Sequence, residues 1–353
     1  MRLSWRASDT IAAIDVNPTR MAGVPLPTEL RLNERIRRAT FAERVELSEP
    51  LQSLWAGYGE LRRVRLAGAR SENAIVKVVT PPSEREFARD AAQLRSHRRK
   101  LRSYQVELAF YEGLAKTCDE TCRVPALIHG EARDERFLFV LEDLDQAGFA
   151  GRRVHCSPVE IAACLAWLAA FHARFLGVEP AGLWPVGTYW HLATRPDELS
   201  RLSSGELRRA ALHIDQGLSS ARFRGLVHGD AKLENFCFSS SGQTVAAVDF
   251  QYVGGGVGVK DVAYFLSSCL SAAECDAQTP AYLELYFHAL RAALCSQESP
   301  FADHADALEC EWRALLPWAW ADFHRFLLGW APAYAAADRY GKKQLALVLN
   351  SAR

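Results

Sequence analysis

Four polar residues in the second half of the chain have the types and spacing that phosphoryl transfer requires. Asp230, Lys232 and Asn235 lie in the segment Leu-Val-His-Gly-Asp-Ala-Lys-Leu-Glu-Asn-Phe, and Asp249 stands fourteen positions after Asn235. Such a reaction needs a carboxylate that orients the nucleophile, oxygen ligands for magnesium, and cations near the phosphates. Protein kinases also have an asparagine five residues after the catalytic aspartate and a metal-binding aspartate at a following strand end. The spacing therefore predicts a site that holds MgATP beside an acceptor hydroxyl.

A predicted β-hairpin explains how these residues meet. Residues 235–238 and 244–250 are short apolar runs, and the turn-forming sequence Ser-Ser-Ser-Gly-Gln lies between them. The hairpin returns the chain, so that Asp249 comes to lie near Asn235. An isolated aspartate or asparagine in a loop is usually a turn former, but four polar groups at this spacing favour a catalytic site.

These motifs resemble a known group of enzymes. The His-Gly-Asp-x-x-x-x-Asn loop and the Asp-Phe-Gln strand end resemble those of the aminoglycoside phosphotransferase and choline kinase superfamily. Residues 99–111, 142–144 and 321–326 also fit its ecdysteroid kinase-like branch, and the resemblance covers roughly residues 45 to 330. It implies a two-lobed, protein-kinase-like fold of the α+β class, ATP and Mg²⁺ as cofactors, and a small-molecule hydroxyl as acceptor.

The resemblance assigns a role to each residue of the loop. Asp230 accepts or steers the proton of the acceptor hydroxyl, and Lys232 points its charge at the phosphoryl group. Because an aspartate of ordinary pKa, about 3.9, is a weak base, alignment is expected to be the main task of Asp230. Asn235 and Asp249 supply the oxygen ligands that Mg²⁺ prefers.

Two further residues are expected to support the loop. His228 braces it by hydrogen bonds rather than by acid–base chemistry. Asp261 begins a predicted helix over residues 262–270, where a carboxylate is a common cap, and the resemblance implies that it also holds the loop backbone. The glycine-rich residues 254–258 are interpreted as a flexible loop, because they lack the strand–turn–helix context of a nucleotide-binding loop.

Lys77 is the candidate cation for the ATP phosphates. It interrupts the apolar run of residues 74–79, which otherwise indicates a buried strand. An unpaired buried ammonium group is costly, and in the fold that the motifs resemble this lysine pairs with a helix glutamate. Glu107 is the predicted partner, because it shares a helix face with Tyr104 and other apolar residues. Glu112 stands four residues before a lysine and is expected in a solvent-exposed pair.

Two other segments are expected to contact the nucleotide. Gly57 and Gly59 precede the strand lysine by twenty and eighteen residues, a distance that suits a two-strand hairpin with a glycine turn over the phosphates. Residues 136–144 indicate a strand that continues into a linker between lobes. The resemblance implies that backbone groups from Glu142 to Leu144 contact the adenine.

Two helices are predicted from their capping residues. Ser83 and Glu86 form a capping-box pattern before a helix, as do Ser157 and Glu160 before the apolar run of residues 158–176. Six basic residues lie between positions 95 and 102, and they are interpreted as a solvated helix face.

The acceptor site is the least defined part of the sequence. Trp318, Asp322 and Arg325 share a helical face, which makes Asp322 and Trp318 candidate substrate contacts. Residues 145–353 hold 21 acidic and 18 basic side chains, a net charge of −3. This bias is too weak to favour a polycationic acceptor over a neutral alcohol, a sugar, a sterol-like or a choline-like one.

Composition gives only broad limits. The 353 residues are 49% hydrophobic, and 42 basic residues balance 42 acidic ones, which favours neither nucleic-acid nor anionic-membrane binding. Apolar runs such as residues 262–273 are too short to span a bilayer. Nine scattered cysteines fit a reducing cytoplasm. The oligomeric state stays open.

The predicted organisation has three parts. Residues 1–40 form a leader with a short helix near residues 28–38, residues 41–144 a β-rich nucleotide-binding lobe, and residues 145–353 a helical lobe with the catalytic loop and the acceptor site. Two rival functions use the same fold. A non-catalytic nucleotide sensor is disfavoured because the Lys77, Asp230, Asn235 and Asp249 set is intact. A protein kinase is disfavoured because Gln251 replaces the glycine of Asp-Phe-Gly and no peptide-docking segment is evident.

Overall fold

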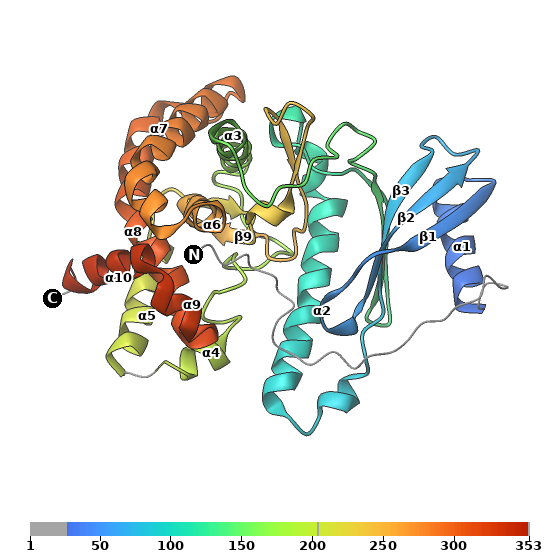
Figure 1. The fold of residues 1–353 in the computed structure, drawn as a ribbon, viewed down its shortest axis with the longest axis horizontal. Coiled ribbons are helices and arrows are strands. Elements are labelled where there is room, and N and C mark those ends of the chain that lie inside the picture. The colour runs from blue at the N-terminus through green and yellow to red at the C-terminus, as the bar shows by residue number, and fades with distance from the viewer. Residues whose placement is uncertain (1–26, 203–204, 352–353) are drawn as a thin grey trace.

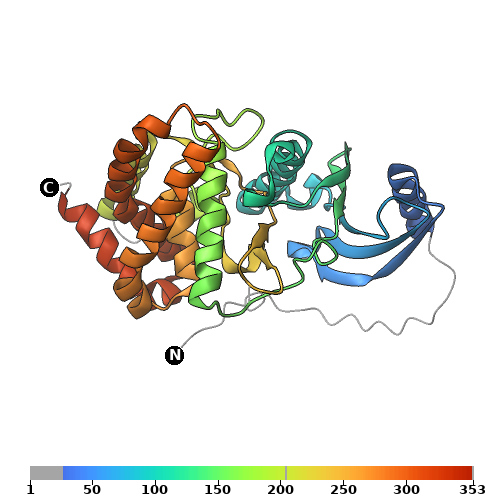
Figure 2. The ribbon, with the colours of Figure 1, turned by 90° about the horizontal axis from the view of Figure 1, so that it is seen from above.

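Two parts of different secondary structure lie side by side in the computed structural model, which describes residues 27–202 and 205–351 (Figures 1 and 2). One is built on a five-stranded antiparallel sheet, and the other consists mainly of helices. The predicted α+β class and two-lobed organisation are therefore confirmed. Of the predicted leader, residues 1–26 lie outside the described residues.

The sheet has the strand order β1-β2-β3-β5-β4. Helix α1 packs on this sheet, because its buried Ile36 joins a cluster of apolar side chains from β2, β3 and β5. The predicted helix near residues 28–38 is confirmed. The bounds of these elements are Pro27–Thr40 for α1, Arg44–Ser53 for β1, Gly59–Ala67 for β2, Asn73–Val79 for β3, Leu127–Arg133 for β4 and Arg136–Glu142 for β5.

Helix α2 (Ala91–Glu112) lies between the sheet and the helical part (Figure 1). Its first turn is capped by Asp90, whose carboxylate accepts from two backbone N–H groups. The predicted capping box of Ser83 and Glu86 is present, but it opens only a short 3₁₀ helix, Glu84–Phe87. The chain must be capped again at Asp90 because this turn ends before α2 begins.

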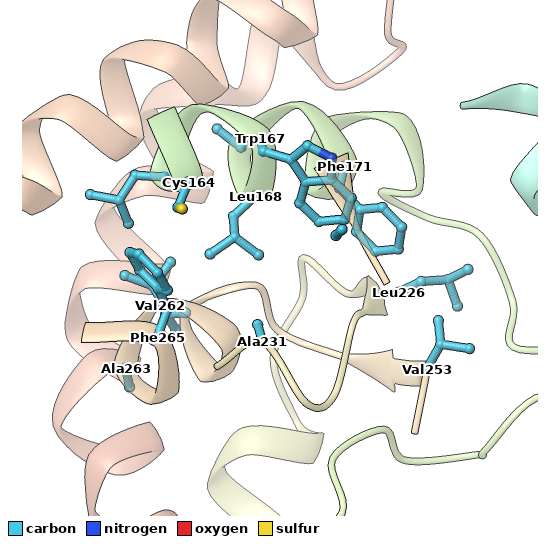
Figure 3. Close-up of a cluster of buried hydrophobic side chains, with 14 of the residues drawn as sticks. Cys164, Trp167, Leu168, Phe171, Leu226, Ala231, Val253, Val262, Ala263 and Phe265 are labelled. Atoms are coloured by element: carbon cyan, nitrogen blue, oxygen red, sulfur yellow. The ribbon is translucent and has the colours of Figure 1, made fainter. Parts of the chain in front are cut away.

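The helical part is organised around helix α3, which begins with the predicted capping box of Ser157 and Glu160. Figure 3 shows Trp167, Leu168 and Phe171 of α3 pointing toward α6 and the catalytic segment. None of the described helices is long and apolar enough to cross a membrane. The helices are α3 Pro158–Arg174, α4 Pro196–Ser200, α5 Gly205–Ser219, α6 Val259–Cys269, α7 Ala272–Ser296, α8 Ala305–Trp330, α9 Pro332–Ala337 and α10 Arg339–Ser351.

Two short strand pairs carry the catalytic segment. Strands β7 (Phe236–Phe238) and β8 (Val245–Ala247) form the predicted hairpin. Strand β6 (Gly225–Val227) pairs with β9 (Gly254–Gly256), so the prediction of a flexible loop over residues 254–258 is wrong. The glycines are required there by packing, since a Cβ atom on Gly254 would lie 2.2 Å from the carbonyl oxygen of Trp184.

Candidate active site

The catalytic loop is held by buried hydrogen bonds. The Asp261 carboxylate accepts from the backbone N–H groups of His228 and Gly229, at 2.5 and 3.0 Å. Asp261 also contacts Nε2 of His172 at 3.1 Å. The predicted backbone contact is present. Asp261 lies in the first turn of α6 rather than at its cap, because α6 begins at Val259.

His228 braces the loop as predicted. Its Nε2 contacts the carbonyl oxygen of Val248 at 3.1 Å, and its Nδ1 accepts from the N–H of Asp230 at 3.2 Å. Burial lowers the pKa of His228, so the ring stays neutral, which suits a role as one donor and one acceptor. Gly229 has a φ of +80°, and a Cβ there would lie 2.0 Å from the Tyr252 carbonyl oxygen. Only glycine fits this turn.

Asp230 lies at the centre of the site and is 8% exposed. The Asn235 side-chain amide donates to its carboxylate at 3.1 Å, and the Lys232 ammonium lies 3.6 Å from the same oxygen. Burial, and next the charge of Asp249, raise the pKa of Asp230 to about 6 against the opposing effects of Lys232 and Asn235. Asp230 is therefore a stronger base than its ordinary pKa predicts.

Asp249 has the features expected of a metal ligand. Its φ of 69° is in the left-handed region, which aspartate tolerates better than most residues. Its Oδ1 atom is buried and has no hydrogen-bond partner among the described residues. Burial opposes ionisation, but the charges of Lys77 and Lys232 lower the pKa of Asp249 below its usual value. The result is an ionised carboxylate with a free oxygen.

These oxygens fit a magnesium ion. The backbone carbonyl oxygen of Asn235 accepts from the Val248 N–H at 3.0 Å. This bond holds Asn235 beside the residue that precedes Asp249. Within residues 27–202 and 205–351, no cluster of three or more His, Cys, Asp or Glu residues could hold a metal by itself. Mg²⁺ is usually held by one or two protein carboxylates together with substrate phosphates, and the side-chain oxygens of Asn235 and Asp249 are of the type that it prefers.

The predicted ion pair between Lys77 and Glu107 is present. The ammonium of Lys77 donates to both carboxylate oxygens of Glu107, at 2.7 and 2.9 Å. Both side chains are buried, and the ring centre of Tyr104 lies 5.3 Å from the ammonium. Burial raises the pKa of Glu107 to about 7 even though Lys77 opposes the shift. Glu112 is exposed as predicted, but no ion pair joins it to a described lysine.

The predicted glycine turn connects β1 and β2. Gly57 has a φ of +73°, and a Cβ atom on it would meet nothing within 4 Å. Gly59 has a φ of +145°, and its Cβ atom would lie 1.9 Å from the carbonyl oxygen of Val78 on β3. The two glycines therefore differ: Gly59 allows close strand packing, whereas Gly57 leaves open space beside the turn.

The predicted adenine-contacting segment follows β5. The Glu142 carboxylate accepts from Arg123 at 2.5 Å and from the Ala126 N–H at 3.0 Å. Its side chain therefore has a structural role in the fold. The Leu144 carbonyl accepts from the Phe149 N–H at 2.8 Å. No described group accepts from the Leu144 N–H, which leaves one backbone donor available for a ligand.

The two predicted acceptor contacts have partners within the fold. The Asp322 carboxylate is 1% exposed and binds Lys260 at 3.0 Å, the Trp190 indole N–H at 3.0 Å, and Arg325. These cations lower the pKa of Asp322 strongly, against the effect of burial. Trp318 packs on the ring of His213, 5.1 Å between centroids. Their contacts indicate structural roles, and their assignment to the acceptor stays a prediction.

Two tyrosines near Asp230 were not found from the sequence. The Tyr264 phenol lowers the pKa of Asp230, and its ring packs edge-on against the ring of Tyr189, with 5.6 Å between the centroids. The Tyr189 N–H donates to the carbonyl oxygen of Gly229, next to Asp230, at 3.1 Å. Tyr264 stands three residues after Asp261 on α6, so helical spacing offered a signal. Tyr189 lies in an irregular segment, and no local pattern indicates it.

The basic segment of α2 corrects another prediction. Arg99 donates to the carbonyl oxygen of Thr194 at 3.0 Å, and Arg102 donates to that of Gly182 at 3.1 Å. Only part of the segment is a solvated face: the Arg98 side chain is 66% exposed and pairs with a glutamate. Because α2 lies between the lobes, Arg95, Arg99 and Arg102 contact the helical lobe (Figure 2). His97 instead hydrogen-bonds the Tyr58 phenol at 2.6 Å on the side of the sheet.

Comparison with known proteins adds a family and a fold. A model described as the phosphotransferase enzyme family matches residues 59–295. The structure is similar to that of a microcompartment-associated aminopropanol kinase, with 19% identity, a TM-score of 0.52, and coverage of 90% of this chain and 96% of that chain. It is also similar to amicoumacin kinase hAmiN in complex with AMP-PNP, Ca²⁺ and Ami, with 15% identity, a TM-score of 0.54, and the same coverage. No curated protein matches in sequence.

Proposed function

Because the chain belongs to the phosphotransferase enzyme family, we propose that it transfers the γ-phosphoryl group of ATP to a hydroxyl group of a small molecule. The observation that carries this proposal is the convergence of Asp230, Asn235 and Asp249 with the Lys77–Glu107 ion pair. A nucleotide sensor without catalysis would not require a buried carboxylate whose pKa is about 6 at the centre of the site.

In this proposal the sheet lobe binds the nucleotide. Lys77, fixed by Glu107, contacts the phosphates as a compact positive charge. The open space beside Gly57 suits the close approach of a phosphate to the turn, and Gly59 shapes that turn. The backbone between Glu142 and Leu144 binds the adenine, since the Leu144 N–H has no acceptor among the described residues.

The catalytic loop carries out the transfer. The acceptor oxygen attacks the γ-phosphorus, the bond to the β-phosphate oxygen breaks, and ADP leaves with the electron pair. Asp230 aligns the hydroxyl group and takes its proton, which its raised pKa favours. Lys232 balances the charge of the transferring group. Asn235 and Asp249 would hold Mg²⁺, which supplies charge neutralisation for the phosphates.

Several finer assignments belong to the same proposal. We assign the chain to the ecdysteroid kinase-like branch on its sequence motifs, with residues 41–144 as the nucleotide lobe and residues 145–353 as the acceptor lobe. The free cysteines agree with a cytoplasmic enzyme. The structural relative in complex with AMP-PNP, an ATP analogue, supports ATP as the donor.

Calorimetric titration of ATP with and without Mg²⁺ tests the proposal. We expect Mg²⁺-dependent binding in the micromolar range, about −8 kcal/mol. Asp249→Ala should weaken this binding because it removes a metal ligand, whereas Asp303→Ala, at an exposed site, should not. Radiolabelled ATP should then label a deproteinised metabolite extract but not bulk protein. Metal-independent binding, or label in protein, would contradict the proposal.

A further inference from the structure

Three cations from the two lobes come together beside the catalytic loop. Arg99 and Lys100 are neighbours on α2, and Arg99 donates to the carbonyl oxygen of Thr194 at 3.0 Å. The next residue, Arg195, donates to the carbonyl oxygen of Tyr189 at 2.9 Å. Arg99 thus contacts the residue that precedes Arg195, and Lys100 follows Arg99 on α2, so the three residues lie in one region. We call these three residues the cation group.

Lys100 is the member of the cation group that lacks a partner. Within residues 27–202 and 205–351, nothing accepts a hydrogen bond from its ammonium group, and no ion pair joins it. It is nevertheless partly buried, and burial lowers its pKa to about 8 even though the charge of Asp249 opposes the shift. A desolvated cation without a counter-ion is costly. We expect an unpaired, partly buried cation of this kind where a bound ligand supplies the opposite charge.

The cation group lies on the side of Asp230 where Tyr189 stands. The Tyr189 phenol senses the charges of both Asp230 and Arg195, and its ring centre is 5.6 Å from the Arg195 guanidinium. The cations assigned to the nucleotide are already paired: Lys77 with a glutamate and Lys232 with Asp230. The cation group adds to these charges: Lys100 lies near Asp249 and Lys77 at the edge of the phosphate site, and Arg99 and Arg195 extend the group toward Tyr189.

Carboxylates nearby do not balance the cation group. Arg195 has Glu198 at 3.6 Å, and among the described residues Arg99 donates to the carbonyl oxygen of Thr194 and to the hydroxyl of Ser96. Asp197, the other acid on this segment, is paired with Arg95. Besides Glu198, the carboxylates near the three cations are Asp249, assigned to the metal, and Glu107, which is paired with Lys77.

We propose that the acceptor alcohol carries an anionic group, a carboxylate or a phosphate, that binds to Arg99, Lys100 and Arg195. This inference rests on the proposed function, because it names the class of acceptor for the same site. An anion there would hold the hydroxyl group beside Asp230, and guanidinium groups suit carboxylate and phosphate oxygens through paired hydrogen bonds.

Calorimetry on the nucleotide-saturated protein tests this inference. The full chain is first saturated with Mg²⁺ and AMP-PNP, so that the nucleotide phosphates occupy their own positions. Inorganic phosphate and malonate are then titrated, with tetramethylammonium chloride as the cationic comparison. Lys100→Gln removes the unpaired charge, Lys100→Arg keeps it, and Arg98→Gln removes an exposed charge from the same helix. Thermal melting of each variant verifies folding.

We expect phosphate and malonate to bind, and tetramethylammonium not to bind. Lys100→Gln should weaken anion binding roughly tenfold or more, since it removes a charge-assisted hydrogen bond, whereas Lys100→Arg and Arg98→Gln should bind nearly as the native protein does. Absence of anion binding, or equal affinity in Lys100→Gln, would overturn the inference and leave the proposed function intact. Failure of AMP-PNP to bind would instead remove the proposed function.

Discussion

The buried ion pair of Lys77 and Glu107 allows stability and catalysis to be separated. The two side chains are 7% and 2% exposed, and two hydrogen bonds join them. Removing one partner of such a pair leaves a buried charge without compensation, which costs about 3–5 kcal/mol. Asp249 also attracts the Lys77 ammonium and offsets part of this loss. We therefore expect Glu107→Gln to destabilise the protein by about 3 kcal/mol.

A double variant distinguishes lost charge balance from lost packing. Lys77→Met combined with Glu107→Leu replaces the ion pair with apolar side chains of similar size, a change that is often neutral in stability. We expect it to recover most of the stability that Glu107→Gln loses. It should nevertheless bind ATP poorly, because the cation that contacts the phosphates in the proposed function is absent.

Urea unfolding measures these free energies, provided that the slope of the free energy of unfolding against urea concentration is the same for all variants. Glu112→Gln is the matched control, because Glu112 is an exposed glutamate on the same helix, and it should change stability by less than about 0.5 kcal/mol. A loss of unfolding free energy in Glu107→Gln no larger than in this control would show that the buried charge is not left uncompensated. A double variant as unstable as Glu107→Gln would show that lost packing, and not lost charge balance, causes the destabilisation.

Three further results are expected. Asp230→Asn should slow transfer by roughly 10²- to 10⁴-fold in single-turnover assays with nucleotide affinity near that of the native protein, and retained turnover would remove Asp230 from its role. The value of kcat/KM should rise about tenfold per pH unit up to about pH 6 and level off above it, because only ionised Asp230 accepts a proton and its pKa is about 6; an inflection near pH 4 would contradict this assignment. Gly229→Ala should lower the free energy of unfolding, measured with urea, by about 3 kcal/mol or more, because Gly229 has a positive φ and lies against the Tyr252 carbonyl. Gly57→Ala, whose new methyl group meets open space, should lower it by about 1–2 kcal/mol.

The parts of the site that were predictable from sequence depend on short-range spacing. Asp230 and Asn235 lie five residues apart in one loop, and a six-residue turn between β7 and β8 returns the chain to Asp249. The pairing of Lys77 with Glu107 followed from the fold that the motifs resemble and from the inward face of α2. In each case local geometry, or a face set by helical periodicity, fixes which groups meet.

The acceptor side was not predictable in this way, because contacts between distant segments build it. The hydrogen bond from Arg99 to Thr194 joins residues 95 positions apart, and Tyr189, from an irregular segment, donates its N–H to the carbonyl oxygen of Gly229 in the catalytic loop. The predicted contact Asp322 had the right charge and helical position, but Lys260 and Arg325 occupy it. Charge in a sequence does not reveal which cation will already be paired after folding.

The placement of Lys100 depends both on helical periodicity and on a contact between distant segments. It stands seven residues before Glu107, so the helical periodicity that identified Glu107 also assigns Lys100 to the inward face of α2. Its position in a run of basic residues suggested solvation instead, and the docking of Thr194 on Arg99 decides against that. The face of α2 that holds Glu107 beside the nucleotide lysine therefore also carries an unpaired cation toward the acceptor. One helix thus links the donor site to acceptor selection. Removing the charge of Lys100 should weaken acceptor binding, and it should also raise the pKa of Glu107, which that charge lowers.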